Sequence, residues 1–430
     1  MRQVMACWLI PKEGMLMRIL ITNAYSWGNK GDCGILLGTV DLLRRLYGRD
    51  LEIDILSFSQ ELDRKHYLKL PNIHGVYENV ICPYRPNPLH LPWGIRILLD
   101  AAWQRSLLAV KAPFLLKRDS YRAIQEADFV IACGGGYLGG DCFSLNYLQL
   151  FLIDTCLKLR KKVVMIGNSV EPCTSSYIRR RLHRTLARLE TVFAREAVTY
   201  QFLTEELQLE NVCMVPDLAF MLQPEPGAID LRRRFSLSQD RPLFGITVRN
   251  CSNDPAKVEA YVSAVAQVMD RCISELQAQF VFLPQVRFLE DDDLQIAKVI
   301  RDRLEADHRS QFILLEEDYA PGLLKSMIGQ CDYFFGTRMH SNIFATSMSV
   351  PTVAIAYEEK TNGIMRMLGL EDYVLGIDTL EPEACYQRIL NCVQHREEIS
   401  SHLQQRIPEI RQQITDRILP YLEQNFPKNQ

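Results

Sequence analysis

Short β-rich runs alternate with helix-length amphipathic segments along this chain, and no other sequence feature constrains its fold as strongly. The first unit is a predicted strand at 18–22, a helix at 33–47 and a second strand at 51–58. Such a unit builds a parallel sheet through a right-handed crossover. The same pattern predicts further strands near 128–132, 162–166, 191–194 and 212–215, with helices between them. We therefore expect one doubly wound α/β half.

The alternation stops once and then restarts. The segment 223–242 contains proline and glycine and lacks helical periodicity, which is typical of a domain boundary. Beyond it, strands are predicted near 243–248, 280–283, 312–315, 332–335, 352–357 and 373–377. We therefore expect two α/β domains, at 17–225 and 240–395, and a helical C-terminal segment at 396–430. Because such sheets bind ligands at the carboxyl ends of their strands, a cleft is expected between the domains.

Composition limits the partners of this protein. Its 49 basic and 52 acidic residues leave a net charge of -3, so no nucleic-acid binding is expected, and any anion site must come from a local group of cations. The 13 cysteines are odd in number and form no CxxC pair, which favours a reducing cytoplasm. Residues 1–16 lack the apolar core of a signal peptide. A chain beginning at Met15 or Met17 would lose no assignable feature, so the sequence leaves the true start residue open.

One stretch, 93–116, is apolar enough to raise the question of a membrane. It is too charged to span a bilayer, because it carries Arg96, Asp100, Arg105 and Lys111. Two interpretations stay open: the segment packs on its own domain, or it lies as a basic amphipathic helix on a membrane surface. We expect a cytoplasmic protein, with peripheral contact to the inner face of the plasma membrane as the second interpretation.

Two glycine-rich segments follow predicted strands of the first domain, at 27–34 and 133–141. Glycines allow backbone amides to approach a ligand closely, and a following helix offers unpaired N–H groups. Neither segment matches a known phosphate signature, so a plain tight turn is the competing interpretation of each. The candidates for a part of the site that holds a hydroxyl-bearing ligand such as a sugar are Gly31, Asp32, Gly135, Gly136 and Asp141. The two aspartates would accept hydrogen bonds from ligand hydroxyls or cap a helix.

Cations follow strands in both predicted domains: Arg195, Arg249, Arg338 and Lys360. Each alone would be read as a surface cation or a structural ion pair. Together at one edge of facing sheets, they indicate a site for a small, multiply charged anion, because arginine binds carboxylate or phosphate bidentately. His340, two residues after Arg338, is placed for proton transfer near neutral pH. Three aspartates at 291–293 open a predicted helix and are read as caps, so neither a metal nor a cofactor is expected.

Taken together, six motifs resemble those of the polysaccharide pyruvyl transferase family: Gly28-Asn-Lys-Gly-Asp32, Gly134-Gly-Gly136, Arg195 between Ala194 and Glu196, Pro216-Asp217, Gly336-Thr-Arg-Met-His340, and Lys360. The resemblance implies two facing Rossmann-like domains, similar to GT-B glycosyltransferases. It also implies an enzyme of exopolysaccharide and cell-envelope synthesis that transfers pyruvate from phosphoenolpyruvate to a sugar as a cyclic ketal. Asn168 differs from the family pattern, in which glutamine is common at this position.

By the same resemblance, Arg195, Arg338 and Lys360 would bind phosphoenolpyruvate, a co-substrate, and His340 with Arg338 would carry the catalysis. The acceptor would be a sugar or a lipid-linked glycan. Two alternatives remain: a nucleotide-sugar glycosyltransferase or epimerase of the same fold, with Glu358 or Glu359 on a ribose, and a non-catalytic sugar-binding protein. The acceptor, the bridged hydroxyls and the oligomeric state are left open by the sequence.

Overall fold

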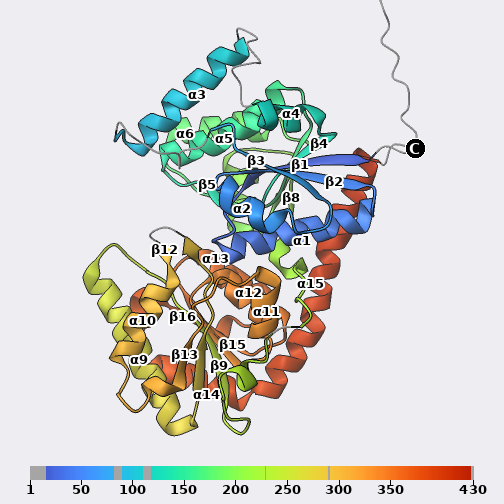
Figure 1. The fold of residues 1–430 in the computed structure, drawn as a ribbon. Helices are drawn as coiled ribbons and strands as arrows, with labels where there is room; N and C mark the ends of the chain where they lie inside the picture. The colour runs from blue at the N-terminus through green and yellow to red at the C-terminus, as the bar shows by residue number, and fades with distance from the viewer. Residues whose placement is uncertain (1–15, 82–89, 110–117, 228, 289–290, 428–430) are drawn as a thin grey trace, which may run out of the picture.

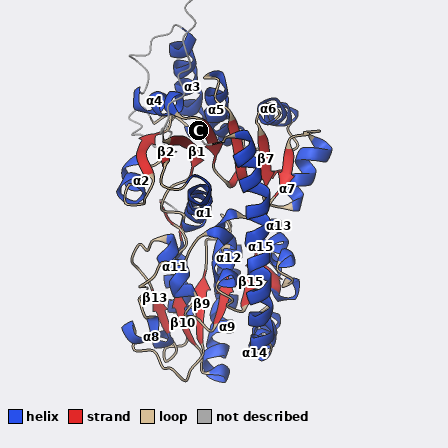
Figure 2. Ribbon diagram, turned by 90° about the vertical axis from the view of Figure 1, so that its right-hand side faces the viewer, coloured by secondary structure: helices blue, strands red, loops and turns tan. Residues whose placement is uncertain are grey.

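The computed structural model describes residues 16–81, 90–109, 118–227, 229–288 and 291–427. It contains two all-parallel sheets, one in each half of the chain, with helices packed on both faces of each sheet (Figures 1 and 2). This arrangement confirms the predicted fold class. The strand ends that carry the candidate residues face each other across the junction between the two sheets.

The first sheet has eight strands in the order β3-β2-β1-β4-β6-β7-β8, with β5 paired to β6. Its strands are β1 (Met17–Ala24), β2 (Leu51–Ser57), β3 (Ile73–Glu78), β4 (Phe129–Ala132), β5 (Gly135–Gly139), β6 (Val163–Glu171), β7 (Thr191–Ala194) and β8 (Val212–Met214). Its helices are α1 (Lys30–Tyr47), α2 (Gln60–Tyr67), α3 (Trp93–Ala109), α4 (Arg118–Glu126), α5 (Phe143–Lys158), α6 (Ser176–Leu186) and α7 (Ala197–Gln201).

Two features of this sheet differ from the sequence prediction. The segment 133–141, for which a ligand-binding loop and a tight turn were the two interpretations, contains the strand β5, in which Gly135 pairs with Asn168 and Leu138 with Val170. A run of glycines carries no side-chain pattern, so this strand leaves no signal in the sequence. At Gly139, where φ is +81°, a Cβ would lie 2.0 Å from the Glu171 carbonyl oxygen, so only glycine allows the strands to approach this closely. The second unpredicted strand is β3.

The second sheet has six strands in the order β13-β10-β9-β14-β15-β16. They are β9 (Leu243–Thr247), β10 (Gln279–Phe282), β13 (Phe312–Leu314), β14 (Tyr333–Gly336), β15 (Thr352–Ala356) and β16 (Val374–Gly376), beside a short antiparallel pair, β11 (Arg287–Phe288) and β12 (Asp291–Asp292). The helices are α8 (Leu231–Arg234), α9 (Pro255–Leu276), α10 (Asp293–Arg303), α11 (Pro321–Ile328), α12 (Met339–Ser347), α13 (Glu359–Met367) and α14 (Pro382–Gln394).

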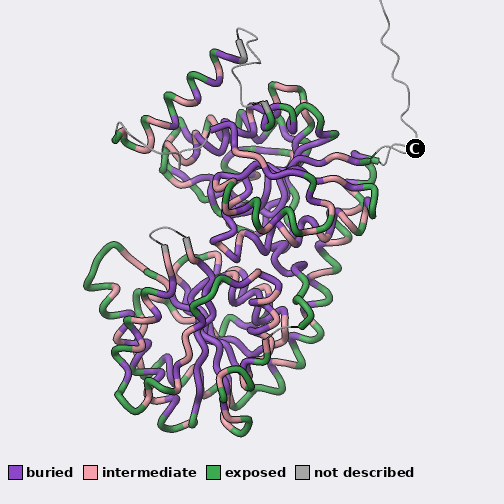
Figure 3. The backbone as a smooth tube through the Cα atoms, in the orientation of Figure 1, coloured by how far each residue is buried: buried purple, intermediate pink, exposed green. Residues whose placement is uncertain are grey.

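The last helix, α15 (Arg396–Asn425), runs from the second domain back to the first (Figure 1). It buries a stripe of apolar side chains at helical spacing: Ile399, Leu403, Ile407, Ile410, Ile414, Ile418 and Leu422. At its end, Tyr47 Oη donates to the Phe426 carbonyl at 2.9 Å, and the ring of Phe426 stacks on Phe129. Buried residues of both domains and α15 form one continuous core, visible as the purple trace through the junction in Figure 3. The two domains are thereby held in a defined relative position.

None of the helices in the described ranges has both the length and the hydropathy that crossing a bilayer requires. The apolar stretch of the sequence forms α3 up to Ala109, and its remainder, 110–116, lies outside the described residues, as do residues 1–15.

Candidate active site

A cavity of about 210 Å³ lies between the carboxyl ends of the two sheets, where the sequence predicted a cleft. Its walls come from segments that follow β1, β5 and β7 in the first domain and β10, β14 and β15 in the second. The predicted site residues that line it are Gly31, Asp32, Gly136, Arg195, Arg338, His340 and Lys360. Residues far apart in the sequence therefore meet in one small space.

Three other predicted residues lie outside the cavity lining. A Cβ on Gly135 would be 3.6 Å from Asp32 Oδ1, so this glycine lies directly behind the cavity wall. Asp141 is exposed and accepts hydrogen bonds from the backbone and hydroxyl of Thr174. It therefore anchors the segment before α6. Arg249 stacks on Tyr357, 3.9 Å from the ring centroid, and Tyr357 itself lines the cavity.

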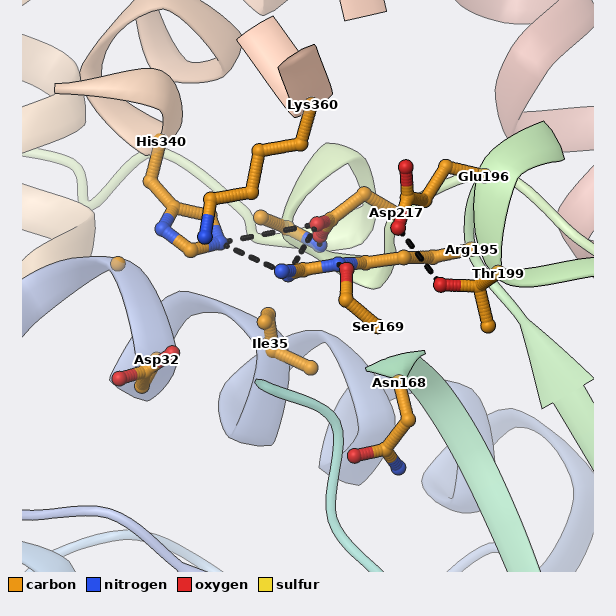
Figure 4. Close-up of polar contacts among 12 residues, drawn as sticks. Asp32, Ile35, Asn168, Ser169, Arg195, Glu196, Thr199, Asp217, His340 and Lys360 are labelled. Carbon is orange, nitrogen blue, oxygen red and sulfur yellow. Dashed lines mark hydrogen bonds and ion pairs between the residues drawn. The ribbon is translucent and has the colours of Figure 1, made fainter. Parts of the chain in front are cut away.

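Arg195 is held rigidly at the cavity by two neighbours behind it (Figure 4). Its Nε donates to Ser169 Oγ at 2.7 Å, and its Nη1 donates to Asp217 Oδ2 at 2.9 Å. A Cβ placed on Gly136 would lie 3.4 Å from Arg195 Nη2 and equally far from Lys360 Nζ. Two cations from opposite domains thus converge on the backbone of Gly136, which has no side chain to separate them.

The carboxylate of Asp217 is fully buried between Arg195 and His340. Burial acts to raise the pKa of Asp217, but the charge of Arg195 and the hydrogen bond and charge of His340 outweigh it and lower this pKa to about 2. Asp217 is therefore ionised at neutral pH. Its carboxylate lies between the imidazole and the guanidinium and fixes the guanidinium by a hydrogen bond.

His340 lies in the first turn of α12, with Nε2 3.4 Å from Arg195 Nη1 and 3.6 Å from Asp217 Oδ2. Its ring packs against the backbone of Gly31, where a Cβ would come within 2.2 Å of Nδ1. The imidazole is thus oriented by both domains. A histidine bridging an aspartate and a ligand cavity can hold and deliver a proton.

Asp32 approaches the cations from the first turn of α1. The helix cap is Asn29, whose Oδ1 accepts from the amides of Gly31 and Asp32 and whose Nδ2 donates to Asp32 Oδ2 at 2.6 Å. Asp32 is therefore not the cap, and its carboxylate faces the cavity. Burial raises the pKa of Asp32, against the opposing charges of His340, Arg195 and Lys360. A carboxylate in this setting is suited to accepting a proton from a hydroxyl.

Arg338 is buried beside Asp293, whose Oδ1 accepts from its Nε at 3.0 Å and its Nη2 at 2.6 Å. The other oxygen of Asp293 accepts from the amide of Val286, a residue of the cavity wall. The capping interpretation of 291–293 is correct for Asp292, whose side chain accepts from Leu294 N. The capping interpretation did not predict that Asp293 pairs with Arg338.

Lys360 forms a short ion pair with Glu358.

The family model for polysaccharide pyruvyl transferases matches residues 29–359 of this chain, a range that includes every cavity residue named above except Lys360. The chain belongs to this family. A curated relative, the amylovoran biosynthesis protein AmsJ of Erwinia amylovora, is 24% identical over 426 residues, which cover 92% of this chain and 96% of AmsJ. The resemblance stated from the motifs is thus confirmed.

Solved structures place this pyruvyl transferase family member in the GT-B fold. A putative UDP-N-acetylglucosamine 2-epimerase from Listeria monocytogenes superposes with a TM-score of 0.60 at 11% identity, covering 96% of both chains. A glycosyltransferase from Rickettsia africae gives 0.57 at 11% identity, covering 95% of this chain and 98% of its own. The UDP-GlcNAc 2-epimerase of Neisseria meningitidis gives a TM-score of 0.55 at 15% identity, and the match covers 90% of this chain and 94% of the epimerase chain. At such identities the likeness concerns the fold alone.

Within this family fold, sequence reasoning missed the buried carboxylates that hold the arginines. Asp217 carried one signal, the Pro216-Asp217 motif, and Asp293 was one of three adjacent aspartates. Ser169 had no signal beyond its place just after the predicted strand 162–166, which in the structure extends through it as β6. In the part of the chain that the structure describes, no group of three or more histidine, cysteine or acidic side chains is arranged to hold a metal.

Proposed function

We propose that this protein transfers the pyruvyl group of phosphoenolpyruvate to a sugar of a polysaccharide or glycan precursor. The product is a cyclic pyruvate ketal, and phosphate is released. The observation that carries the proposal is the convergence of Arg195, Arg338, Lys360 and His340 on one cavity of about 210 Å³. Family membership supports a transferase of polysaccharide modification, and the donor and product are the further step proposed here.

The cavity suits this donor in size and in charge. Phosphoenolpyruvate joins a phosphate and a carboxylate through three carbons, so its negative groups lie close together. Arg195 and Lys360 approach the cavity from opposite domains, and Arg338 forms part of the wall. Guanidinium groups held in place by Asp217 and Asp293 need no reorganisation to bind an oxyanion, which is the condition for efficient electrostatic stabilisation.

In the proposed first step, protonated His340 delivers a proton to the methylene carbon of phosphoenolpyruvate. The C2 carbon gains oxocarbenium character, and a sugar hydroxyl attacks it while Asp32 takes the hydroxyl proton. The C2–O bond to phosphate then breaks, and a second hydroxyl of the same sugar closes the ketal. Asp32 passes the first hydroxyl proton to the departing phosphate, and the proton of the second hydroxyl restores His340. Arg195, Arg338 and Lys360 stabilise the phosphate and carboxylate throughout.

Thermal stabilisation by phosphoenolpyruvate tests the donor. Wild type and Arg338→Ala are compared with phosphoenolpyruvate, UDP, GDP and phosphate, since a ligand at about 100 times its dissociation constant adds about 2.7 kcal/mol. We expect a melting shift with phosphoenolpyruvate alone that Arg338→Ala abolishes. A shift with a nucleotide alone would favour the alternative, a nucleotide-sugar glycosyltransferase or epimerase, and would refute this donor.

Phosphate release tests the reaction. With phosphoenolpyruvate and a glycan acceptor, His340→Gln should fold normally, retain the phosphoenolpyruvate-dependent melting shift and lose turnover. Near-normal turnover would remove His340 from the acid role.

A further inference from the structure

Several large apolar side chains of α3 are exposed to solvent. Figure 3 shows exposed residues in green along this helix. Leu99 and Trp103 are each 56% exposed, and Ile95 and Leu98 are also exposed. At about 100° per residue, these four side chains, with Ala102 and Ser106, share an arc of about 140°. No charged residue of α3 falls within this arc.

The opposite face of α3 already has a partner within the domain. Ile97, Ala101 and Leu107 are buried, and the helix packs on α5. Burial of α3 in its own core therefore accounts for one side of the helix only. Of the two interpretations left open by the sequence, packing on the domain is correct for this inner face and leaves the outer face unexplained.

Two exposed aromatic side chains lie on helices near the start of α3. Phe143 begins α5 and Tyr177 lies in the first turn of α6, with ring centroids 5.4 Å apart, and both are exposed. The start of α3 adjoins them, since a Cβ on Gly94 would lie 3.5 Å from Ser144 Cβ. We call Ile95, Leu98, Leu99, Trp103, Phe143 and Tyr177 the α3 surface.

Positive charge borders the α3 surface. The helix α6 carries no acidic residue and four arginines: Arg179, Arg180, Arg181 and Arg184. Arg179 pairs with Glu206 and Arg181 with Asp154, so the positive border rests on Arg180 and Arg184. It adjoins α3 through α5, because Arg105 of α3 and Arg181 of α6 lie over the same Tyr147 ring, 5.5 and 5.6 Å from its centroid. Arg180 and Arg184 are exposed. In a chain of net charge -3, this local concentration is not a consequence of composition.

We propose that the α3 surface docks the first domain on an anionic lipid bilayer. Exposed leucine, isoleucine and tryptophan side chains would enter the headgroup and acyl boundary, with α3 lying in the membrane plane, and the α6 arginines would meet anionic headgroups. The combination of an apolar arc with a basic border favours this partner, because an anionic bilayer supplies acyl chains for the apolar side chains and negative headgroups for the arginines.

The α3 surface and the cavity share a helix end. Phe143 belongs to the surface, and Leu145, two residues later in α5, lines the cavity. Docking would therefore hold the cavity close to the membrane. If the proposed function is correct, the acceptor that this arrangement serves is a lipid-linked glycan.

Flotation with vesicles tests the docking on the full chain. We expect binding to vesicles of phosphatidylcholine mixed with phosphatidylglycerol, and little to phosphatidylcholine alone. Leu99→Ser with Trp103→Ser, or Arg180→Glu with Arg184→Glu, should weaken binding at least about tenfold. Val299→Ser, which alters an exposed apolar residue of the second domain, should leave binding unchanged. Circular dichroism confirms that each variant is folded.

Trp103 itself reports on insertion. Its fluorescence should shift to the blue on anionic vesicles and be quenched by brominated lipid, and Trp103→Phe should remove this signal. Absence of vesicle binding at low salt would overturn the docking. So would a vesicle-free dimer that Leu99→Ser with Trp103→Ser dissociates, since a second copy would then cover the surface. Vesicle binding without phosphoenolpyruvate turnover would instead contradict only the proposed function.

Discussion

The backbone of Gly31, in the first domain, lies against the imidazole of His340, in the second, so closely that a Cβ on Gly31 would come within 2.2 Å of His340 Nδ1. This contact fixes the position of His340, the candidate acid, relative to α1, the helix that also carries Asp32. His340, the proposed proton donor, and Asp32, the proposed acceptor of the sugar hydroxyl proton, are thereby held in a fixed relation across the domain junction.

Gly31→Ala should lower kcat/KM by about 100-fold, because the imidazole must move and small displacements of a catalytic group carry costs of this size. The measurement is steady-state phosphate release from phosphoenolpyruvate. The matched control is Gly363→Ala in α13, where a Cβ meets nothing within 4 Å. It should keep full activity, with a melting temperature at least equal to that of wild type. Equal effects of both variants would contradict the Gly31 contact.

Arg195→Lys should lower kcat/KM by about 100-fold or more, because lysine cannot replace a guanidinium that binds Ser169 and Asp217 and still faces the cavity. Arg188→Lys is the control, since Arg188 is a half-exposed residue with only a long contact to Asp154. Turnover and KM for phosphoenolpyruvate are measured for both. A lysine variant of Arg195 with normal KM would show that bidentate geometry is not required.

Asp293→Ala should destabilise the protein by about 1.5–3 kcal/mol, because the buried guanidinium of Arg338 loses the carboxylate that accepts from its Nε and Nη2. Combining it with Arg338→Met should recover part of the loss, since the guanidinium that had lost the Asp293 carboxylate is then also removed. Urea denaturation followed by circular dichroism gives the comparison. Additive losses in the double variant would mean that the two residues are not energetically coupled.

The buried carboxyl of Asp63 should make stability depend on pH. Burial raises the pKa of Asp63 to about 6, although Ser57, the Trp27 amide and Ser26 donate hydrogen bonds to it. Its unfolded pKa is about 3.9, so the folded state binds the proton more tightly, and this stabilisation is lost as the pH rises from about 4 to 6. The loss amounts to about 3 kcal/mol.

Asp63→Asn should remove this pH dependence and increase stability at pH 7 relative to wild type. Unfolding by urea, measured at intervals between pH 4 and 7 for both proteins, checks the expectation. Parallel stability curves would show that Asp63 does not titrate in this range.

Local patterns in the sequence determined the fold class and predicted several of the residues that line the cavity. Strands and helices alternate because each must bury an apolar face of fixed period, so the parallel sheets were predictable from periodicity. Parallel strands all end at one edge, so Arg195, Arg338 and Lys360 could be expected to meet. The strand β5 was missed because its glycines carry no pattern.

The tertiary structure alone decided the pairings within the cavity. Asp217 lies 123 positions before His340 in the numbering, and Asp293 lies 45 before Arg338, so no periodicity links them. Their proximity depends on how the two domains and α15 pack, a sum of many contacts of no fixed sequence separation. The outer face of α3 is a similar case, because the same apolar pattern suits a buried helix and a membrane-facing one. The sequence by itself determined which residues could act in a site, because local periodicity places them at strand ends. Packing determined which of them meet, because contacts join residues at any separation along the chain.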